Sequence, residues 1–302
     1  MGNSRAESSA AHHWPSGEHG LTTREVTIEP GVRIRLVEAG PEDGAPAVLL
    51  HGWACSAYSF RFLIPDLAAA GFRVTAPDLM GHGYSEKPGD ATCYGTGALL
   101  RHADAIVRLA SAGRRPLVVG HSMGGGLALQ LALNEPDRFR ALALLSSVGL
   151  GKVPVATLGR WLSPQAIEPL LPLVVRRWVF GLVLSLVRGR GSSYESRDVD
   201  EYWAPTEDPA FLPALRAMLH GFDWSLMDGE RLASLRPSTL VVLGELDRLL
   251  VAMKEDWPGW EALRGRGVRI LRIPGGGHVI HEERPQLVRD AVLRLMSEAP
   301  AE

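Results

Sequence analysis

A serine stands between glycines in the stretch from Pro116 to Asn134, which reads PLVVGHSMGGGLALQLALN. The apolar run 117–119 predicts a buried strand, and 124–134 predicts an almost wholly apolar helix, so a turn must join them. Glycines on both sides of Ser122 allow a cramped backbone, which would present the serine Oγ at the apex of that turn. A serine hydroxyl is a poor nucleophile by itself, so a base and an oxyanion-stabilising group must reach it from elsewhere.

Three further loops with reactive side chains follow predicted strands. They are His51-Gly52-Trp53, the GELD segment that ends at Asp247, and the glycine run that ends at His278. The carboxyl ends of parallel strands meet at one edge of an open α/β sheet, so these loops are expected to converge. A serine, then an acid, then a histidine is the chain order of one known catalytic triad.

Two neighbouring residues compete for these roles. His281 also follows the last predicted strand, but His278 comes directly after three glycines, whereas His281 lies among residues suited to a helix start. Glu245 could also reach an imidazole, but we interpret it as a solvated loop residue. His51 and His121 are expected to be structural.

The elements that must position these loops alternate along the chain. A hairpin is predicted first, then strands and helices in turn up to residue 145, which is typical of a mostly parallel, doubly wound sheet. Between 149 and 237 the composition shifts to Trp, Leu, Pro and Arg, with helical patches and no convincing strand. The predicted strands are 25–28, 32–38, 47–50, 73–76, 117–119, 141–145, 239–243 and 268–273, and the clearest helices are 59–70, 97–112, 124–134 and 284–296.

The chain resembles the α/β-hydrolase superfamily from about Glu25 to Ser297. The motifs are HGW at 51–53, DLMGHGYS at 78–85, GHSMGG at 120–125, GELD at 244–247 and GGGHVIHEERP at 275–285. The resemblance implies an eight-stranded, mostly parallel sheet with helices on both faces and an inserted helical cap. It also implies that Ser122 is the nucleophile, His278 the general base and acid, and Asp247 the partner of the imidazole. The amides of Trp53 and Met123 would form the oxyanion hole.

We therefore predict three parts: a flexible tail at 1–22, a hydrolase core at 23–148 and 238–302, and a helical cap at 149–237. The many apolar residues of the cap predict a lipophilic pocket over Ser122. Trp161, Trp178 and Val279 are the candidate substrate-binding residues.

Composition excludes several classes of protein. The charge of -2, with 32 basic and 34 acidic residues, leaves no basic stripe for nucleic acid. Neither a metal cluster nor a phosphate-binding loop is apparent, so we expect no metal and no cofactor. The longest apolar stretch, 170–187, is interrupted by a proline and two arginines, so no integral membrane segment is expected. Two cysteines favour a reducing compartment, and we expect a cytoplasmic protein with a small-molecule substrate. The sequence leaves open whether the chain forms a homodimer.

A serine nucleophile favours hydrolysis of an ester or thioester through an acyl-enzyme, since related dehalogenases and epoxide hydrolases use a carboxylate there. A carbon–carbon bond hydrolase acting on vinylogous diketo acids is the first alternative, although Val279 and Cys55 depart from that subgroup. A ligand receptor or a non-hydrolytic biosynthetic catalyst is the second, because fold does not fix function.

Overall fold

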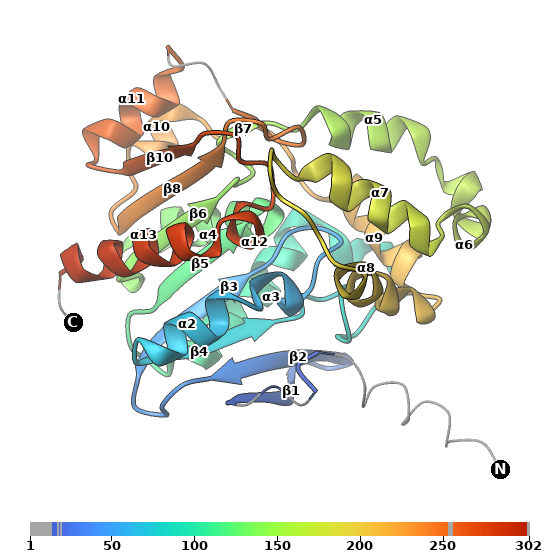
Figure 1. Ribbon diagram of the computed structural model, residues 1–302, viewed down its shortest axis with the longest axis horizontal. Coiled ribbons are helices and arrows are strands. Elements are labelled where there is room, and N and C mark those ends of the chain that lie inside the picture. The colour runs from blue at the N-terminus through green and yellow to red at the C-terminus, as the bar shows by residue number, and fades with distance from the viewer. Residues whose placement is uncertain (1–13, 17, 19, 253–255, 301–302) are drawn as a thin grey trace.

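The computed structural model describes residues 14–16, 18, 20–252 and 256–300, and an eight-stranded sheet forms its centre (Figure 1). The strand order is β1-β2-β4-β3-β5-β6-β8-β10. β1 is antiparallel to β2, and β2 is antiparallel to β4, whereas all other neighbours are parallel. The predicted fold class is therefore confirmed. The strands are β1 (Leu21–Glu29), β2 (Val32–Ala39), β3 (Ala45–Leu50), β4 (Phe72–Pro77), β5 (Leu117–His121), β6 (Ala141–Leu145), β8 (Ser238–Gly244) and β10 (Arg269–Ile273).

Helices cover both faces of the sheet. Alternate residues of a strand point to opposite faces, so in β3 Val48 and Leu50 join one apolar cluster while Ala47 and Leu49 join the other. Every residue of β5 and β6 is buried, as expected for central parallel strands covered twice. One face carries α3 (Thr96–Ser111), α4 (Ser122–Asn134) and α11 (Pro258–Gly265), and the other carries α2 (Leu63–Ala69), α12 (Ile280–Glu283) and α13 (Pro285–Glu298).

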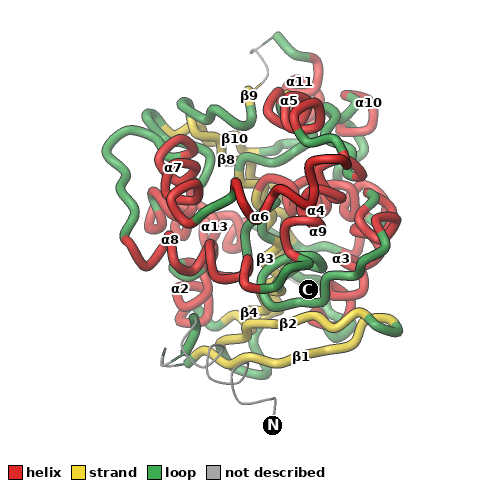
Figure 2. The backbone as a smooth tube through the Cα atoms, turned by 90° about the vertical axis from the view of Figure 1, so that its right-hand side faces the viewer, coloured by secondary structure: helices red, strands yellow, loops and turns green. Residues whose placement is uncertain are grey.

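The segment between β6 and β8 is mostly helical, and most of it lies to one side of the sheet (Figures 1 and 2). Two short strands were not predicted: β7 (Gly151–Lys152) pairs antiparallel with β9 (Val251–Ala252). This ladder ties the first residues of the insertion to the loop after β8. The helices are α5 (Pro154–Leu162), η4 (Gln165–Leu170), α6 (Leu171–Val174), α7 (Arg177–Val187), α8 (Ser196–Trp203), η5 (Ala204–Glu207), α9 (Phe211–Gly221) and α10 (Gly229–Leu232).

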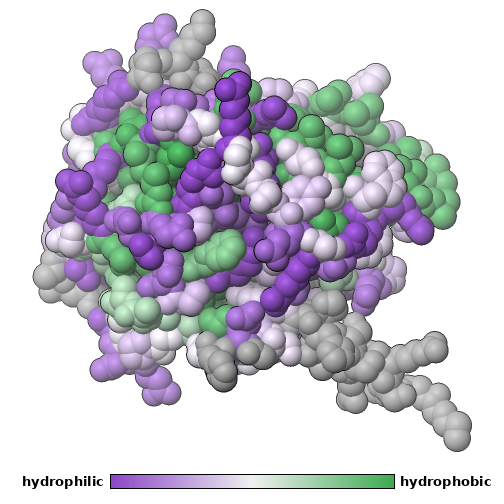
Figure 3. All heavy atoms as spheres, viewed as in Figure 1, coloured by the Kyte–Doolittle hydropathy of each residue, from purple (hydrophilic) through white to green (hydrophobic). Residues whose placement is uncertain are grey.

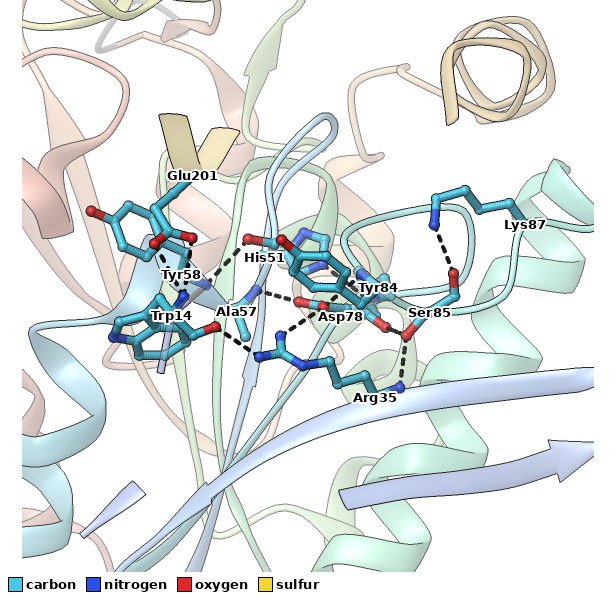
Figure 4. A network of polar contacts seen from close by, with 12 residues as sticks. Trp14, Arg35, His51, Ala57, Tyr58, Asp78, Tyr84, Ser85, Lys87 and Glu201 are labelled. Carbon is cyan, nitrogen blue, oxygen red and sulfur yellow. Dashed lines mark hydrogen bonds and ion pairs between the residues drawn. The ribbon is translucent and has the colours of Figure 1, made fainter. Parts of the chain in front are cut away.

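Trp14 lies within the predicted flexible tail, but its ring is buried, with 4% of the residue exposed. The Trp14 amide donates to Glu201 Oε1 of α8 (3.1 Å), and its carbonyl accepts from Arg35 Nη2 of β2 (2.8 Å). Its ring meets the edge of Tyr58 with centroids 5.7 Å apart (Figure 4). The tail prediction is therefore corrected at Trp14, because aromatic burial and two hydrogen bonds fix it between the sheet and α8. Residues 1–13, 17 and 19 lie outside the described residues.

Within the described residues, no single helix combines the length and apolarity needed to cross a bilayer. Two segments, Gln165–Val174 and Arg177–Val187, meet that criterion only as a pair, and they are bent by 99° relative to each other.

Candidate active site

Ser122 occupies a strained turn between β5 and α4. Its φ is +52°, in the left-handed region that side-chain-bearing residues rarely adopt, and α4 begins at this residue rather than at the predicted Gly124. The neighbouring glycines are required by close packing. A Cβ on Gly124 would lie 2.2 Å from the Leu50 carbonyl oxygen, and one on Gly125 would lie 2.6 Å from Ser147 Oγ. The turn therefore presses Ser122 against the end of β3.

Asp247 and His278 form a hydrogen-bonded pair in the loops that follow β8 and β10. His278 Nδ1 lies 2.8 Å from Asp247 Oδ2, and both side chains are buried. The other carboxylate oxygen accepts the amides of Leu249 and Leu250 at 2.9 and 2.8 Å. Burial acts to raise the pKa of Asp247, but the charge and hydrogen bond of His278 and the Leu250 amide outweigh it, so this pKa is lowered. Asp247 is thus held ionised, and it fixes the imidazole with Nδ1 as the donor.

Ser122 and His278 line one cavity of about 470 Å³ between the sheet and the helical insertion. The main-chain amide of His278 donates to the Val187 carbonyl at the end of α7 (2.7 Å), which ties the histidine loop to the insertion. Most of the wall is apolar. Its principal contributors are Val155 and Ala156 of α5, Val179, Val183 and Leu184 of α7, and Leu215 and Leu219 of α9.

The competing residues lie elsewhere. Glu245 is exposed, and His281 is buried away from the cavity wall, with both ring nitrogens lacking a hydrogen-bond partner among the described residues. Burial and the neighbouring histidines hold the pKa of His281 well below its usual value. Burial likewise lowers the pKa of His121 to about 3, and its Nε2 lies 3.1 Å from the His278 carbonyl oxygen. Both rings are therefore neutral, which suits a packing role.

The two predicted oxyanion-hole residues come from adjacent loops. Trp53 follows β3 and lines the cavity, and its indole Nε1 donates to the Leu215 carbonyl of α9 (2.9 Å). Met123 is the second residue of α4, so its amide is one of the first-turn donors that have no intrahelical acceptor. The predicted oxyanion hole depends on these two main-chain amides, since such donors stabilise an oxyanion.

A buried carboxylate holds the loop that carries Trp53. Asp78 accepts the amides of Ala57 (2.8 Å) and Tyr84 (2.9 Å) and pairs with Arg35 Nη1 (3.0 Å), as Figure 4 shows. Next to it, the Leu79 amide donates to His51 Nε2 (2.9 Å), and His51 Nδ1 donates to the Gly52 carbonyl (2.8 Å). The expected structural role of His51 therefore has a specific form, since it joins the loops after β3 and β4.

Replacing Asp78 by alanine should lower the free energy of unfolding by about 3–5 kcal/mol, because it leaves the Arg35 guanidinium without its carboxylate partner and the amides of Ala57 and Tyr84 without their acceptor. Denaturant unfolding of the variant measures this loss.

The stabilisation by Asp78 should depend on pH. Burial acts to raise the pKa of Asp78, but Arg35 and the two amides lower it by more, so the net shift of this pKa is downward. The stabilisation is thus present above the unfolded pKa of about 4 and is lost as pH falls through the folded pKa. Asp78→Asn should consequently approach the parent protein in acid, and a difference that grows in acid would contradict this account.

The structure does not bring Trp161 and Trp178 to the cavity. They are 78% and 66% exposed, on the outer faces of α5 and α7, and their predicted role in substrate binding is not retained. Val279 is buried and lines the cavity beside His278. The inward faces of the same helices supply the wall instead, from residues such as Ala156 and Val179.

Two polar residues near the site were not predicted from the sequence. Ser146 directly follows β6 with φ +43°, and its side chain contributes to the lowered pKa of the Asp247 carboxyl. The rule that reactive groups follow parallel strands would have identified it. Arg216 of α9 is a cationic wall residue, and it pairs with Glu168 (3.1 Å). No cluster of three or more metal-binding side chains occurs among the residues that the structure describes.

Comparison with known proteins assigns the family. The family model for the alpha/beta hydrolase fold matches residues 46–285, and the chain belongs to this family. The 2-hydroxymuconate semialdehyde hydrolase of Pseudomonas sp. (strain CF600) is 38% identical over 134 residues, which are 42% of this chain and 44% of that protein. The chain thus matches less than half of that relative's length.

Two further proteins match over most of the chain. The magnesium-chelatase 30 kDa subunit of Rhodobacter capsulatus is 30% identical over 257 residues, 82% of this chain and 85% of that protein. The 2-hydroxy-6-oxo-6-phenylhexa-2,4-dienoate hydrolase from Rhodococcus sp. strain RHA1 superimposes with a TM-score of 0.73, covering 92% of this chain and 99% of that one. Its sequence identity is 22%, so this likeness concerns the fold alone.

Proposed function

We propose that the protein is a serine hydrolase that cleaves an ester or thioester of a largely apolar small molecule. The observation that carries the proposal is that His278, hydrogen-bonded to Asp247, lines the same apolar cavity as the strained Ser122. An imidazole held through Nδ1 has its Nε2 free for a hydroxyl proton, and a serine at a strand-to-helix turn is the usual nucleophile of such a pair.

In the proposed reaction, Ser122 Oγ attacks the carbonyl carbon and passes its proton to His278 Nε2. The negative charge that develops on the carbonyl oxygen is stabilised by the amides of Trp53 and Met123, and Asp247 stabilises the imidazolium. The imidazolium then protonates the leaving alcohol or thiol, and the acyl group remains on Ser122. Water activated by His278 attacks that ester, which releases the acid and restores the serine.

The cavity wall supports an apolar substrate. Arg216 is the cation among the described wall residues, and its guanidinium is already engaged by Glu168 and by the Ser163 carbonyl (3.1 Å). A free carboxylate on the substrate would have to compete for that guanidinium, whereas an alkyl or aryl group would be buried against valines and leucines.

One alternative has a specific observation in its favour. The Pseudomonas relative is a hydrolase of 2-hydroxymuconate semialdehyde, so a carbon–carbon bond hydrolase that acts on vinylogous diketo acids remains a candidate. The test is to compare kcat/KM for aryl esters of graded acyl length with that for a vinylogous diketo acid. We expect the esters to be preferred, and a clear preference for the diketo acid would overturn the proposal.

The Rhodobacter relative supports the other alternative, because its name is that of a chelatase subunit and not of a hydrolase. A non-hydrolytic role on this fold would not require a reactive serine. Turnover of any ester in the panel, absent in Ser122→Ala, would favour hydrolysis, and no turnover of any substrate would favour the non-hydrolytic role.

Acyl length should be limited by the wall at Val179. Each methylene that enters the cavity should raise kcat/KM about fourfold, from about 0.8 kcal/mol per buried CH₂, until the cavity is filled. Val179→Trp should remove this gain for long acyl chains and leave acetyl esters nearly unchanged. Trp178→Ala is the matched control, since this neighbour faces solvent on the same helix. A chain-length profile altered by the control and not by Val179→Trp would refute this view of the cavity.

A further inference from the structure

The outer surface of the helical insertion is unusually apolar. Six residues of α5, α6 and α7 form what we call the cap patch, and each is at least half exposed: Trp161, Leu162, Leu173, Val174, Trp178 and Leu182. Figure 3 shows apolar side chains gathered over these helices. Single exposed apolar residues are ordinary on proteins, but a contiguous group of this kind marks an interaction surface.

The segment that carries the cap patch has more basic than acidic residues. Residues 152–187 contain four basic residues and one acidic residue, Glu168, which is paired with Arg216. Arg176 is exposed at the junction of α6 and α7, and Arg177 is paired with Asp200 of α8. An apolar surface with cationic residues at its margin complements a bilayer that contains anionic lipid.

The helices that carry the cap patch also supply part of the cavity wall. Val155 of α5 and Val183 of α7 line the cavity and are 40% and 47% exposed, and Val183 is next in sequence to Leu182 of the cap patch.

We propose that the cap patch docks onto the surface of an anionic lipid bilayer, with α6 and α7 lying in its interface. α7 has 11 residues, so it is about 16 Å long and too short to cross a hydrocarbon core of about 30 Å. Its opposite face is also committed to the protein, since Leu184 and Val187 are buried. Exposed tryptophans such as Trp161 and Trp178 suit the level of the headgroups.

A second copy of the chain is a less suitable occupant. In a symmetric dimer through the cap patch, the same surface of each protomer would face the other. The exposed Arg176 of each copy would then meet a surface with the same excess of positive charge. Anionic lipid headgroups supply the opposite charge instead. Docking does not depend on the proposed catalysis, because none of the six residues lines the cavity.

The test is co-flotation of the full-length protein with vesicles of phosphatidylcholine, with and without phosphatidylglycerol. We expect binding that is stronger with phosphatidylglycerol and weakens with added salt. The triple variant Trp161→Ser, Leu173→Ser and Trp178→Ser should bind at least about tenfold more weakly, since removing one buried apolar side chain already corresponds to about that factor. The matched control replaces Leu109 and Leu287, which are exposed on α3 and α13, by serine and should float like the parent.

Two further variants separate the contributions. Arg176→Glu should reduce binding to the anionic vesicles about fivefold or more without affecting the neutral ones. Ser122→Ala should float like the parent, so a failure of the proposed function leaves this readout intact. The proposal is overturned if the parent does not float, or if the triple variant floats equally well. It is also overturned if light scattering shows a dimer that the triple variant converts to a monomer while neither protein binds vesicles.

Discussion

Replacing Ser122 by alanine should lower kcat for ester hydrolysis by about 10⁵–10⁶-fold, the loss typical of a missing serine nucleophile. The reason is that no acyl-enzyme can form, and only the oxyanion hole and substrate binding remain to accelerate direct attack by water. Steady-state kinetics with a good aryl ester measure the effect. Unfolding by denaturant should be nearly unchanged, because no large side chain is removed.

The matched control is Ser59→Ala. Ser59 is also a buried serine in the core, and its Oγ lacks a hydrogen-bond partner among the described residues. This variant should keep kcat within a fewfold of the parent. If Ser122→Ala and Ser59→Ala had similar activities, the nucleophile would have been assigned to the wrong residue.

The base can be assigned by the same logic. His278→Ala should cost about as much as Ser122→Ala, and the double variant should be no worse than either single one, because the two side chains act in one step. His281→Leu should retain activity, since that ring forms no hydrogen bond among the described residues and lies outside the cavity wall. A large loss in kcat for His281→Leu without unfolding would contradict the choice of His278.

Asp247→Asn should lower kcat by about 10⁴-fold while KM changes little. Asparagine nearly preserves the shape of the side chain but has no charge to stabilise the imidazolium, and its amide can hold the ring in the wrong tautomer. The lowered pKa of Asp247 means that the carboxyl is ionised at neutral pH, so the substitution removes a charge that is present during turnover.

Glu245→Gln is the control for this carboxylate. Glu245 lies two residues earlier on the same loop and is exposed, so its amide variant should retain nearly full activity. An equal loss in both variants would indicate that the loop as a whole, and not the bond between Asp247 and His278, determines the rate.

Much of the sheet could be predicted because its signals are local. The sequence predicts a strand at 117–119 and a helix after it, because two apolar runs are separated by a segment that contains four glycines. β5 and α4 occupy these positions in the structure. The helix begins at Ser122, two residues before the start predicted from the glycines. The positive φ of Ser122 lets the chain turn from strand to helix at that residue. The two-residue strands β7 and β9 could not be predicted, since so short a ladder depends on contacts between distant loops.

In the cap, the spacing of apolar residues does not indicate which helix face lines the cavity. Apolar residues surround α7 almost completely, so the sequence could not distinguish Val179, which lines the cavity, from Trp178, which faces solvent. The sequence analysis named tryptophans as binding residues, whereas the orientation of α7 directs Val179 toward the cavity. Trp14 was missed for a related reason, because its partners Tyr58 and Glu201 are far away in sequence.

The central claim is that one hydroxyl in this chain is activated by the imidazole beside it. The most direct measurement is to incubate the protein with a fluorophosphonate and to locate the adduct by peptide mass spectrometry. We predict a rapid stoichiometric adduct on Ser122 that disappears in Ser122→Ala and is strongly slowed in His278→Ala. An adduct on another residue, or labelling of Ser122 that does not depend on His278, would contradict the account.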